Sequence, residues 1–366
     1  MDNLDKLRQW TQEQHLDVTY VSDPININYY THFLSDPHER TLGLFVFPDH
    51  DPFIFAPALE VESVKAVGWP YEVFGYLDHE NAYEMIADLI KARVKNPVNW
   101  AIEKEQLQVS RYEALINYFP EAVFNVNATD FIEQQRLYKT PAEIELMLAA
   151  GREADEAFKV GFNAVSSERT EQQVVAEIEY HMMAQGVMHM SFDTIVQSGP
   201  NAANPHGAPL PEKIKPNALV LFDLGTDHKG YMSDASRTIA YGKIDAKSKD
   251  IYDVCLTAQL AAMDAAKPGI TAAQLDKVAR DIITKAGYGD YFIHRLGHGL
   301  GTSVHEFPSI MAGNDLVLEP GMCFSIEPGI YIPDVAGVRI EDCVHITTTG
   351  CEPFTHTPKT LQTFPL

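Results

Sequence analysis

Cysteine is scarce in this sequence, and long apolar runs are missing. Four cysteines occur in 366 residues and form no Cys-x-x-Cys pair, which disfavours a disulfide framework and a zinc knuckle. No stretch approaches the roughly 18 apolar residues of a membrane span. The first residues, 1–8, carry acids where a signal peptide carries bases. We therefore expect a cytoplasmic protein with reduced, mostly buried thiols.

Positive charge is also in short supply. The sequence has 28 Lys and Arg against 51 Asp and Glu, which gives a net charge of −23. Such a field repels phosphate backbones and anionic lipids, so we expect no nucleic-acid partner and no membrane partner. The same field suits a protein that binds cations or small neutral solutes.

The rest of the composition is that of a globular protein, with 45% hydrophobic and 22% charged residues. A chain of 366 residues exceeds one typical domain of about 150 residues, so two domains are expected. Strand-like and helix-like segments alternate over residues 1–126, which predicts an α/β domain. A linker is expected over 127–139. The capping box Thr140-Pro-Ala-Glu143 then opens a helix to about Asn163 and a second domain over 140–366.

Hydrophobic periodicity places the elements of the first domain. The expected helices are 4–15, 61–67, 82–94 and 111–119, and the expected strands are 18–21, 42–47, 52–56 and 100–102.

The second domain contains a short internal repeat. Thr170-Glu-Gln-Gln-Val and Thr271-Ala-Ala-Gln-Leu each open a predicted helix, and each threonine is followed 16 residues later by a glycine, Gly186 or Gly287. Strand-like residues follow at 191–197 and 291–294. Two similar halves predict a pseudo-symmetric domain with a site between the halves.

Carboxylates interrupt two apolar strands of this domain. Asp223 stands in the run Ala218-Leu-Val-Leu-Phe-Asp-Leu-Gly, and Asp234 follows the turn at 227–230. A hairpin centred between His228 and Lys229 pairs residues whose numbers sum to 457. That register places Asp223 opposite Asp234, with Cβ atoms roughly 5 Å apart.

A second pair of acids has the same form. Glu327 ends the apolar run that begins at Cys323, and Glu341 interrupts β-forming residues after the loop 333–337. The midpoint of the two glutamates is 334, near the centre of that loop, so we expect them to converge as well. The Pro328-Gly329 break makes this register less regular.

Two matched acid pairs indicate bound cations. A single acid in a strand is often at an exposed edge, and one pair can serve as an acid–base dyad. Four buried carboxylates would repel one another and take up protons unless cations joined them. Oxygen-rich sites suit hard or borderline divalent ions, and two ions about 3.5–4 Å apart share bridging carboxylates. Four carboxylates and a bridging hydroxide carry −5, close to the +4 of two divalent ions.

A candidate nitrogen ligand lies in Gly297-His298-Gly299-Leu-Gly301. The glycines allow the backbone to approach a ligand closely, although a structural role stays open for His298 and for His305. The run lacks the Lys-Ser/Thr end of a P-loop and the spacing of a dinucleotide fingerprint. The sequence has no Gly-x-Ser-x-Gly and no His-Glu-x-x-His motif.

These segments resemble the metallopeptidases with the pita-bread fold, the family of methionine aminopeptidase, aminopeptidase P, prolidase and creatinase. The matching segments are Leu-Phe-Asp223-Leu-Gly, Ser-Asp234-Ala-Ser-Arg-Thr, Gly-His298-Gly-Leu-Gly, Glu327-Pro-Gly-Ile-Tyr and Gly-Val-Arg-Ile-Glu341-Asp.

The branch of the family follows from two further features. The first domain, with Asn26-Ile-Asn-Tyr-Tyr-Thr-His-Phe, looks like the N-terminal domain of the prolidase and aminopeptidase P branch, which methionine aminopeptidases lack. Creatinases lack the metal ligands. The length and the run Asn201-Ala-Ala-Asn-Pro-His206-Gly look most like the Xaa-Pro dipeptidases of lactic acid bacteria.

The resemblance implies two divalent metal ions per chain, most often Mn²⁺ in this branch, with Co²⁺ or Zn²⁺ as alternatives. It implies that Asp223 holds one metal, that His298 and Glu327 hold the other, and that Asp234 and Glu341 bridge both. It also places His206, His294 and His305 around the substrate and Arg339 beside the metal site, and all four are expected to bind the substrate. His189 has no counterpart and is expected to be structural.

The implied function is hydrolysis of Xaa-Pro dipeptides by a water or hydroxide that bridges the metals. Glu327 is placed to shuttle a proton, and His305 or His206 to donate a hydrogen bond to the oxyanion. Phe192 is a candidate for a pocket that reads the proline ring. One alternative is an aminopeptidase P that acts on longer Xaa-Pro-Yaa peptides and shares every ligand. Another is a non-catalytic binding protein on the same fold.

The family is commonly homodimeric, with the first domain of one chain near the active site of the other. The loop 35–40 contains Asp36, His38, Glu39 and Arg40. Such a loop is usually only solvated. In a dimer it can instead reach the partner's site, bind the charged ends of a dipeptide and exclude longer peptides.

Overall fold

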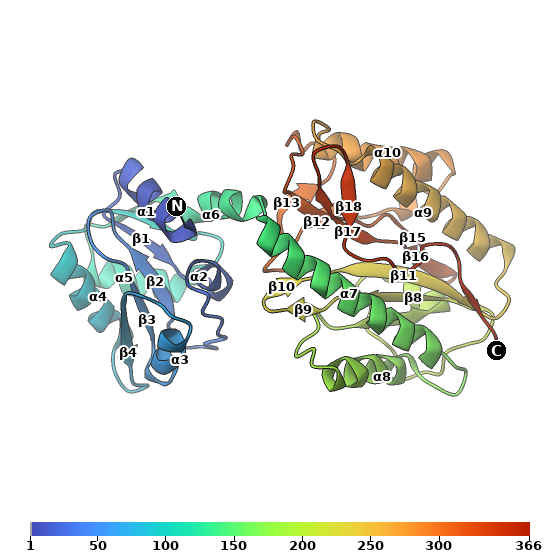
Figure 1. The fold of residues 1–366 in the computed structure, drawn as a ribbon, viewed down its shortest axis with the longest axis horizontal. Coiled ribbons are helices and arrows are strands. Elements are labelled where there is room, and N and C mark those ends of the chain that lie inside the picture. Colours follow the sequence, from blue (N-terminus) through green and yellow to red (C-terminus); the bar gives the residue numbers. More distant parts are fainter. Residues whose placement is uncertain (1) are drawn as a thin grey trace. The chain divides into compact units, whose positions relative to one another are not determined.

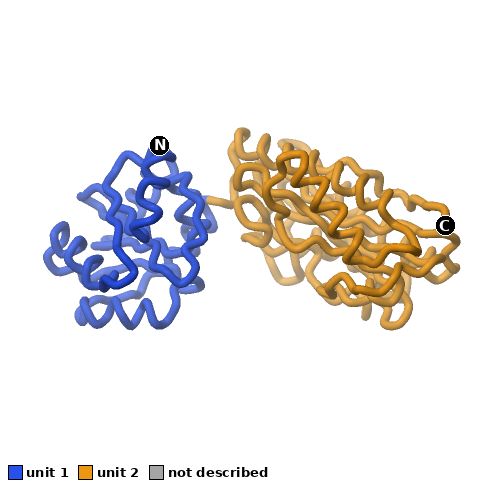
Figure 2. The backbone as a smooth tube through the Cα atoms, turned by 90° about the horizontal axis from the view of Figure 1, so that it is seen from below, with its two compact units in different colours: residues 1–135 blue, residues 136–366 orange. Residues whose placement is uncertain are grey.

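The computed structural model describes residues 2–366 and divides the chain into two compact units (Figure 2). Unit 1 ends at Gln135 and unit 2 begins at Arg136. The division falls inside the segment 127–139, which was expected to be a linker. Most of that segment is the helix α6 (Ala128–Leu137), which the sequence pattern did not predict. Within residues 2–366, no helix is long and apolar enough to cross a membrane.

Unit 1 is a six-stranded mixed sheet with helices on both faces (Figure 1). Its strands are β1 (Val18–Val21), β2 (Gly43–Val46), β3 (Phe53–Pro57), β4 (Glu72–Tyr76), β5 (Asn99–Ile102) and β6 (Val123–Asn127), in the order β4-β3-β2-β1-β5-β6. Its helices are α1 (Asn3–Glu13), α2 (Pro24–Thr31), η1 (Ala58–Glu60), α3 (Val61–Ala66), α4 (Ala82–Arg93) and α5 (Val109–Tyr118).

Alternating residues of the central strands face two separate cores. Val21 and Leu44 lie in a core with side chains of α1, α2, α3 and α6. Tyr20 and Phe45 lie in the other core, with side chains of α4 and α5. Every helix and strand that the periodicity predicts in this unit is confirmed within a few residues. Helix α2 and the strands β4 and β6 were not predicted, because each is too short or too polar to show a clear period.

Unit 2 is built from two helix-and-sheet halves. Its helices are α7 (Pro141–Ala164), α8 (Glu171–Ala184), η2 (Gly199–Ala203), α9 (Ala246–Ala265), α10 (Ala272–Lys285) and η3 (Gly289–Tyr291). Its strands are β7 (Ile195–Ser198), β8 (Ala218–Leu224), β9 (Asp227–His228), β10 (Tyr231–Met232), β11 (Ala235–Tyr241), β12 (Gly297–Gly299), β13 (Glu306–Ile310), β14 (Cys323–Ile326), β15 (Gly329–Ile332), β16 (Ala336–Arg339), β17 (Asp342–Ile346), β18 (Cys351–Pro353) and β19 (Thr363–Phe364).

The two halves of unit 2 repeat one arrangement. Helices α7 and α8 pack on the sheet β19-β11-β8-β7, and α9 and α10 pack on the sheet β13-β12-β14-β17-β18 (Figure 1). A short hairpin extends each half, β9-β10 in the first and β15-β16 in the second. The backbones meet where the Glu341 N–H donates to the Ser236 carbonyl at 3.0 Å. The pseudo-symmetry expected from the repeat is therefore present.

The helix starts in unit 2 follow from capping chemistry. Thr140 and Glu143 form the expected capping box at α7. Thr170 and Thr271 each form a capping box with a glutamine three residues later, at α8 and α10. The repeated glycines, Gly186 and Gly287, have positive φ values of 94° and 86°, the conformation that ends a helix without a Cβ clash. The strand expected at 291–294 is wrong, since that segment ends a 3₁₀ turn and continues as a loop.

Candidate metal centre and substrate cavity

The first acid pair lies on a hairpin whose register differs by two residues from the prediction. His228 pairs with Tyr231, and Asp223 pairs with Ser236, so paired residues sum to 459 and not 457. The two central turn residues, Lys229 and Gly230, both have positive φ, at 54° and 83°. That is the geometry of a type I′ turn, which favours glycine at its second position. Asp223 and Asp234 are therefore diagonal neighbours on one face and do not pair directly.

The second acid pair lies in the predicted register. Cys323 pairs with His345 in β14 and β17, and Gly329 pairs with Arg339 in β15 and β16, so both ladders have the midpoint 334. Glu327 and Glu341 fall in the interval between the two ladders, at opposite positions of the same register. Because the ladder is interrupted at Pro328, Glu327 and Glu341 belong to neither pair of strands. Both residues lie where the two halves of unit 2 meet.

His298 lies on the short strand β12, beside these acids. Its Nε2 is 3.4 Å from Asp234 Oδ2 and 3.3 Å from Glu327 Oε1. Its Nδ1 is 3.0 Å from the Gly299 carbonyl, which leaves Nε2 for a ligand. The flanking glycines serve a different purpose from the one expected. A Cβ on Gly297 would lie 1.8 Å from the Ser325 carbonyl oxygen, and one on Gly299 would lie 2.2 Å from that of Phe307. The glycines admit neighbouring backbone and not a ligand.

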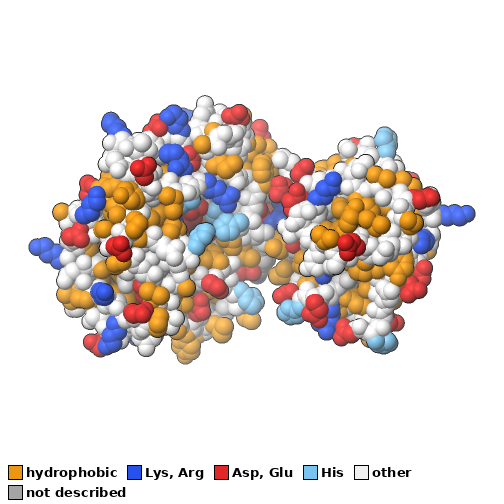
Figure 3. Space-filling model, turned by 180° about the vertical axis from the view of Figure 1, so that it is seen from behind, with side chains coloured by type: hydrophobic (Ala, Val, Ile, Leu, Met, Phe, Trp, Pro, Cys, Tyr) orange, Lys and Arg blue, Asp and Glu red, His pale blue; other side chains and the backbone are white. Residues whose placement is uncertain are grey.

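One cavity of about 440 Å³ collects the predicted site. It is lined by Phe192, Ile195, Pro205, His206, Asp223, Asp234, His294, Arg295, His298, Val304, His305, Glu327, Arg339 and Glu341. All nine site residues expected from the sequence are in this set, together with Phe192. Figure 3 shows histidine side chains, in pale blue, gathered on one face of unit 2. His189 lies outside this cavity.

The carboxylates have oxygens that lack a hydrogen-bond partner. Among the buried polar atoms of residues 2–366, Asp223 Oδ1, Asp234 Oδ1 and Glu341 Oε1 have none. Asp234, His298 and Glu341 each offer a ligand atom within 4.8 Å of the others. Burial raises the pKa of Asp234 well above its usual range, and the charges of Asp223 and Glu327 add to the rise. Burial raises the pKa of Glu341 in the same way, together with the charge of Asp234. This donor set fits divalent cations, which would satisfy these oxygens.

One oxygen each of Glu341, Glu327 and Asp223 is held by a protein group. Ser236 Oγ donates to Glu341 Oε2 at 2.6 Å, and Ser325 Oγ donates to Glu327 Oε1 at 3.0 Å. Arg339 is buried and forms an ion pair with Asp223. The Arg339 guanidinium also donates to Ser236 Oγ at 2.7 Å and to the Tyr331 hydroxyl at 2.8 Å. Arg339 therefore fixes Asp223, a candidate metal ligand. This agrees with the expected place of Arg339 beside the metal site, while its expected role in substrate binding stays a prediction.

The cavity histidines differ in how firmly they are held. His294 Nδ1 is 2.7 Å from the Arg295 carbonyl, and its Nε2 is 3.0 Å from the Tyr331 hydroxyl. The His305 ring lies 4.2 Å from the His298 ring. Burial lowers the pKa of His305 to about 4, helped by the charge of His298, so its ring is neutral at neutral pH. His206 is exposed on the loop after η2.

Sequence reasoning missed two residues of the site. Tyr331 joins His294 to Arg339, and its signal was the tyrosine of the Glu327-Pro-Gly-Ile-Tyr segment. Arg295 lines the cavity, donates to Ser309 Oγ at 2.7 Å and has no carboxylate partner among the described residues. Arg295 lies two residues before the Gly297-His298-Gly299 run, and no sequence motif marked it as a site residue.

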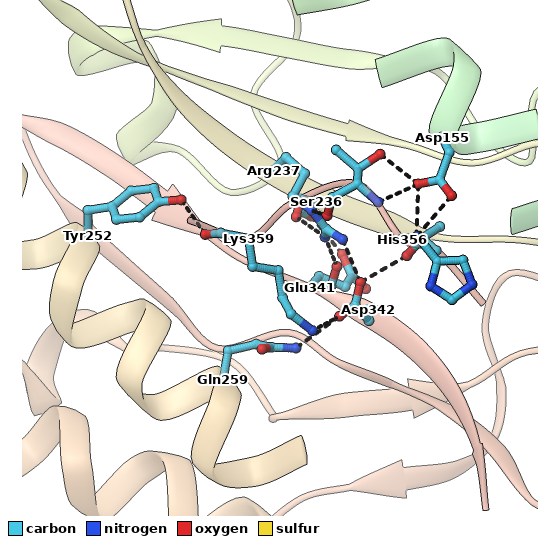
Figure 4. A network of polar contacts seen from close by, with 11 residues as sticks. Asp155, Ser236, Arg237, Tyr252, Gln259, Glu341, Asp342, His356 and Lys359 are labelled. Atoms are coloured by element: carbon cyan, nitrogen blue, oxygen red, sulfur yellow. Dashed lines mark hydrogen bonds and ion pairs between the residues drawn. The ribbon is translucent and has the colours of Figure 1, made fainter. Parts of the chain in front are cut away.

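A buried polar network supports the ligands from behind (Figure 4). Arg237 donates to the carbonyls of Ser236 and Glu341 and forms an ion pair of 2.6 Å with Asp342. Lys359 forms a second ion pair with Asp342. Burial alone would raise the pKa of Asp342, but the charges of Arg237 and Lys359 outweigh it and lower that pKa. The network ties the backbone on both sides of the site to the C-terminal segment.

Comparisons with known proteins agree with this geometry. Residues 145–348 match Metallopeptidase family M24, and residues 3–138 match the Creatinase/Prolidase N-terminal domain. A protein named Xaa-Pro dipeptidase from Lactobacillus helveticus is 58% identical over 365 residues, which cover 100% of this chain and 99% of that protein. A protein of the same name from Lactobacillus delbrueckii subsp. lactis has the same identity and coverage.

Solved structures extend the agreement to the whole fold. A prolidase from Thermococcus sibiricus matches with a TM-score of 0.94 at 32% identity and covers 100% of both chains. An X-Pro aminopeptidase from Thermotoga maritima matches with a TM-score of 0.86 at 27% identity, again over 100% of both chains. The family matches span nearly the whole sequence, and the relatives match it from end to end. The chain therefore belongs to metallopeptidase family M24, with a creatinase/prolidase N-terminal domain and a catalytic unit of the pita-bread fold.

Proposed function

We propose that this enzyme hydrolyses Xaa-Pro dipeptides at a centre of two divalent metal ions. The observation that carries the proposal is the convergence of Asp223, Asp234, His298, Glu327 and Glu341 on one cavity, where three buried carboxylate oxygens have no hydrogen-bond partner within residues 2–366. Full-length relatives named Xaa-Pro dipeptidase at 58% identity support the choice of substrate.

The five ligands divide between two ions. Asp223 is assigned to one ion, His298 and Glu327 to the other, and Asp234 and Glu341 to both. Four carboxylates and a hydroxide carry −5, and two divalent ions together with the Arg339 guanidinium beside Asp223 carry +5. We propose Mn²⁺ as the native ion, because hard carboxylate oxygens make up most of the donor set.

The bound ions supply a nucleophilic water at neutral pH and polarise the scissile carbonyl. The residues of the chain do the rest. Ser325 holds Glu327 Oε1, which leaves the other carboxylate oxygen to take a proton from the nucleophile and pass it to the leaving proline nitrogen. His305 is neutral and lines the cavity, so its ring N–H donates to the developing oxyanion, as does His206, which lines the same cavity.

The substrate is matched by apolar walls and one cation. Phe192, Ile195, Val304 and Pro205 give the cavity apolar surface for a side chain and a proline ring. Arg295, which has no carboxylate partner among the described residues, offers a charge to the free carboxylate of a dipeptide. The proline nitrogen of an Xaa-Pro bond carries no N–H, so the site needs no hydrogen-bond acceptor at that position.

Compartment and assembly belong to the same proposal. The four cysteines are free, and three of them are buried, which supports work in the reducing cytoplasm. The homodimer, and the approach of the loop 36–40 to a partner's site, stay predictions. Within unit 1 that loop is anchored, because the Arg40 guanidinium binds both oxygens of Asp78, at 2.8 and 3.1 Å.

The test compares three peptides with the Mn²⁺-loaded enzyme. We expect hydrolysis of Leu-Pro, little hydrolysis of Leu-Pro-Gly and none of Leu-Gly. Faster hydrolysis of Leu-Pro-Gly than of Leu-Pro would replace the dipeptidase with an aminopeptidase P. Tight binding of Leu-Pro without hydrolysis, at full metal content, would indicate a binding protein and overturn the proposal.

A further inference from the structure

The loop that carries His206 has little packing to hold it. Asn204, His206, Ala208 and Leu210 are exposed. A second cavity of about 380 Å³ lies against its base, lined in part by Ser198, Gly199 and Asn201. A hydrogen-bond donor that acts on an oxyanion must nevertheless be placed to within a fraction of an ångström. Something other than a hydrophobic core has to hold this loop.

One holding group is the carboxylate of Glu171, in the first turn of α8. The residue is 2% exposed, and its two oxygens accept four hydrogen bonds. Oε1 accepts from the Ser198 N–H at 2.6 Å and from Ser198 Oγ at 2.8 Å. Oε2 accepts from Asn201 Nδ2 at 2.7 Å and from the Leu210 N–H at 2.8 Å. These contacts fasten the loop on both sides of His206.

The second holding group is the side-chain amide of Gln197, at the end of β7. The residue is fully buried, and its Nε2 donates to the Asn204 carbonyl at 3.1 Å and to the Gly207 carbonyl at 2.8 Å. A Cβ on Gly207 would lie 2.3 Å from this nitrogen, so the glycine makes the contact possible. Gln197 therefore closes the loop directly across His206.

The two side chains act on one regularly spaced set of positions. Glu171 and Gln197 together bind residues 198, 201, 204, 207 and 210, and His206 lies inside this series. The series begins at Ser198, the last residue of β7, and continues through η2, which packs on β16, the strand of Arg339. A Cβ on Gly337 would lie 1.6 Å from the Ala202 carbonyl oxygen. This close contact between η2 and β16 fixes the start of the loop relative to the strand that carries Arg339.

We propose that Glu171 and Gln197 are positioning residues that hold His206 against the scissile bond. This inference rests on the proposed function of His206. Neither side chain lines the cavity of the metal centre, so both act through the loop. Replacing either one leaves the ligands in place and lets His206 move away from its productive position.

The test is a double-mutant cycle between the positioning residues and His206. In the wild-type background, Glu171→Gln and Gln197→Met should each lower kcat for Leu-Pro about 10- to 100-fold, with KM changed less, because the lost contact is made mainly in the transition state. In a His206→Ala background the same changes should have little further effect. Glu177→Gln is the matched control, since it makes the same change on α8 at a partly exposed pair with Arg169, away from the His206 loop.

A second measurement does not depend on activity. Hydrogen exchange of the amides at 199–210 should accelerate in Glu171→Gln and Gln197→Met, with two metal ions still bound, and should not change in Glu177→Gln. If Glu171→Gln does not fold, Ser198→Ala removes only the hydroxyl contact with Glu171, and a smaller effect of the same kind is expected. Equal losses of kcat in the wild-type and His206→Ala backgrounds would overturn the proposal, as would unchanged exchange. A wild type that does not cleave Leu-Pro would instead reject the proposed function, and the exchange result would still decide whether these residues hold the loop.

Discussion

At the scale of single residues, burial sorts the carboxylates of the cavity. Glu327 and Asp223 are partly exposed and have a serine and an arginine partner. Asp223 also has one oxygen that is unpaired within the described part of the chain, and Glu341 accepts from Ser236 at one of its oxygens. Asp234 and Glu341 are at most 5% exposed, and each has an oxygen with no partner among the described residues. A buried carboxylate in this state is stable only when it is protonated or bound to a cation. These two residues are therefore the ones that depend most on metal.

Removing the charge of Asp234 or Glu341, the two proposed bridging ligands, should remove the metal. We expect Asp234→Asn and Glu341→Gln to weaken Mn²⁺ binding by about 100-fold or more, since outer contacts alone cost about 10- to 100-fold. His305→Gln, which changes a neighbour of His298, should keep close to two ions per chain while turnover falls. Metal analysis after dialysis checks both expectations. Loss of both ions from His305→Gln would contradict the division between ligands and substrate residues.

At the scale of elements, the turns decided which registers could be read from sequence. Glu327 and Glu341 were placed correctly because the loop between β15 and β16, residues 333–335, is centred on Asp334, which has a positive φ of 60°. Asp223 and Asp234 were misplaced by two residues, because the choice between His228-Lys229 and Lys229-Gly230 as the turn depends on backbone φ. The face of the strand was still right, since a shift of two preserves alternation.

The glycines of β12 should be needed for packing between strands. We expect Gly297→Ala to destabilise the enzyme by about 1–3 kcal/mol or more, because the new Cβ meets the Ser325 carbonyl at 1.8 Å. It should also weaken metal binding through His298. Gly350→Ala is the control, since nothing lies within 4 Å of its Cβ position and its φ is not positive. Thermal unfolding of the two variants side by side checks this, and equal stabilities would be evidence against the close approach.

In unit 1, Glu103 joins the end of β5 to the start of α2. It is fully buried and accepts hydrogen bonds from the Asp23 N–H at 2.8 Å and from Asn26 Nδ2 at 2.6 Å, as well as from Ser22. Burial raises its pKa to about 7, although these donors work to lower it. The folded chain therefore binds a proton that the unfolded chain releases between about pH 4.5 and 7.

This difference gives stability a defined pH dependence. The contribution of Glu103 is greatest below its unfolded pKa of about 4.5 and falls by up to about 3 kcal/mol as pH rises through 7. Glu103→Gln cannot titrate, so its unfolding free energy should fall less steeply over this range than that of the wild type. Chemical unfolding at several pH values between 4.5 and 8 measures both slopes. Parallel slopes would mean that the carboxylate is already ionised in the fold.

At the scale of the whole molecule, the sequence predicted the domains, the capped helices and the cavity residues. It did not predict the long-range hydrogen bonds that hold the loops of the site in place. The two-part organisation, the repeated capped helices and the nine cavity residues could be predicted, because each depends on local patterns or on a family motif. The clamp of Glu171 and Gln197 on the His206 loop could not, since its partners are separated by up to 39 residues and no period or motif marks them. The Arg237–Asp342 network was missed for the same reason, since its two partners lie 105 residues apart.

The net charge of −23 means that Mn²⁺ can act on the whole chain as well as on the cavity. Such a protein collects divalent cations loosely over its surface, so stabilisation by Mn²⁺ does not by itself identify the site. We expect a chelator to abolish hydrolysis of Leu-Pro, and Mn²⁺ at about 100 times its Kd to restore it. The same addition should stabilise the fold by about 2.7 kcal/mol, which raises Tm by roughly 5–10 °C for a unit of this size. The double variant Asp234→Asn/Glu341→Gln keeps nearly all of the surface charge but lacks the bridging carboxylates, so its Tm should hardly respond to Mn²⁺. An equal rise in Tm in that variant would assign the stabilisation to the acidic surface, and full activity in the presence of chelator would reject a metal-dependent enzyme.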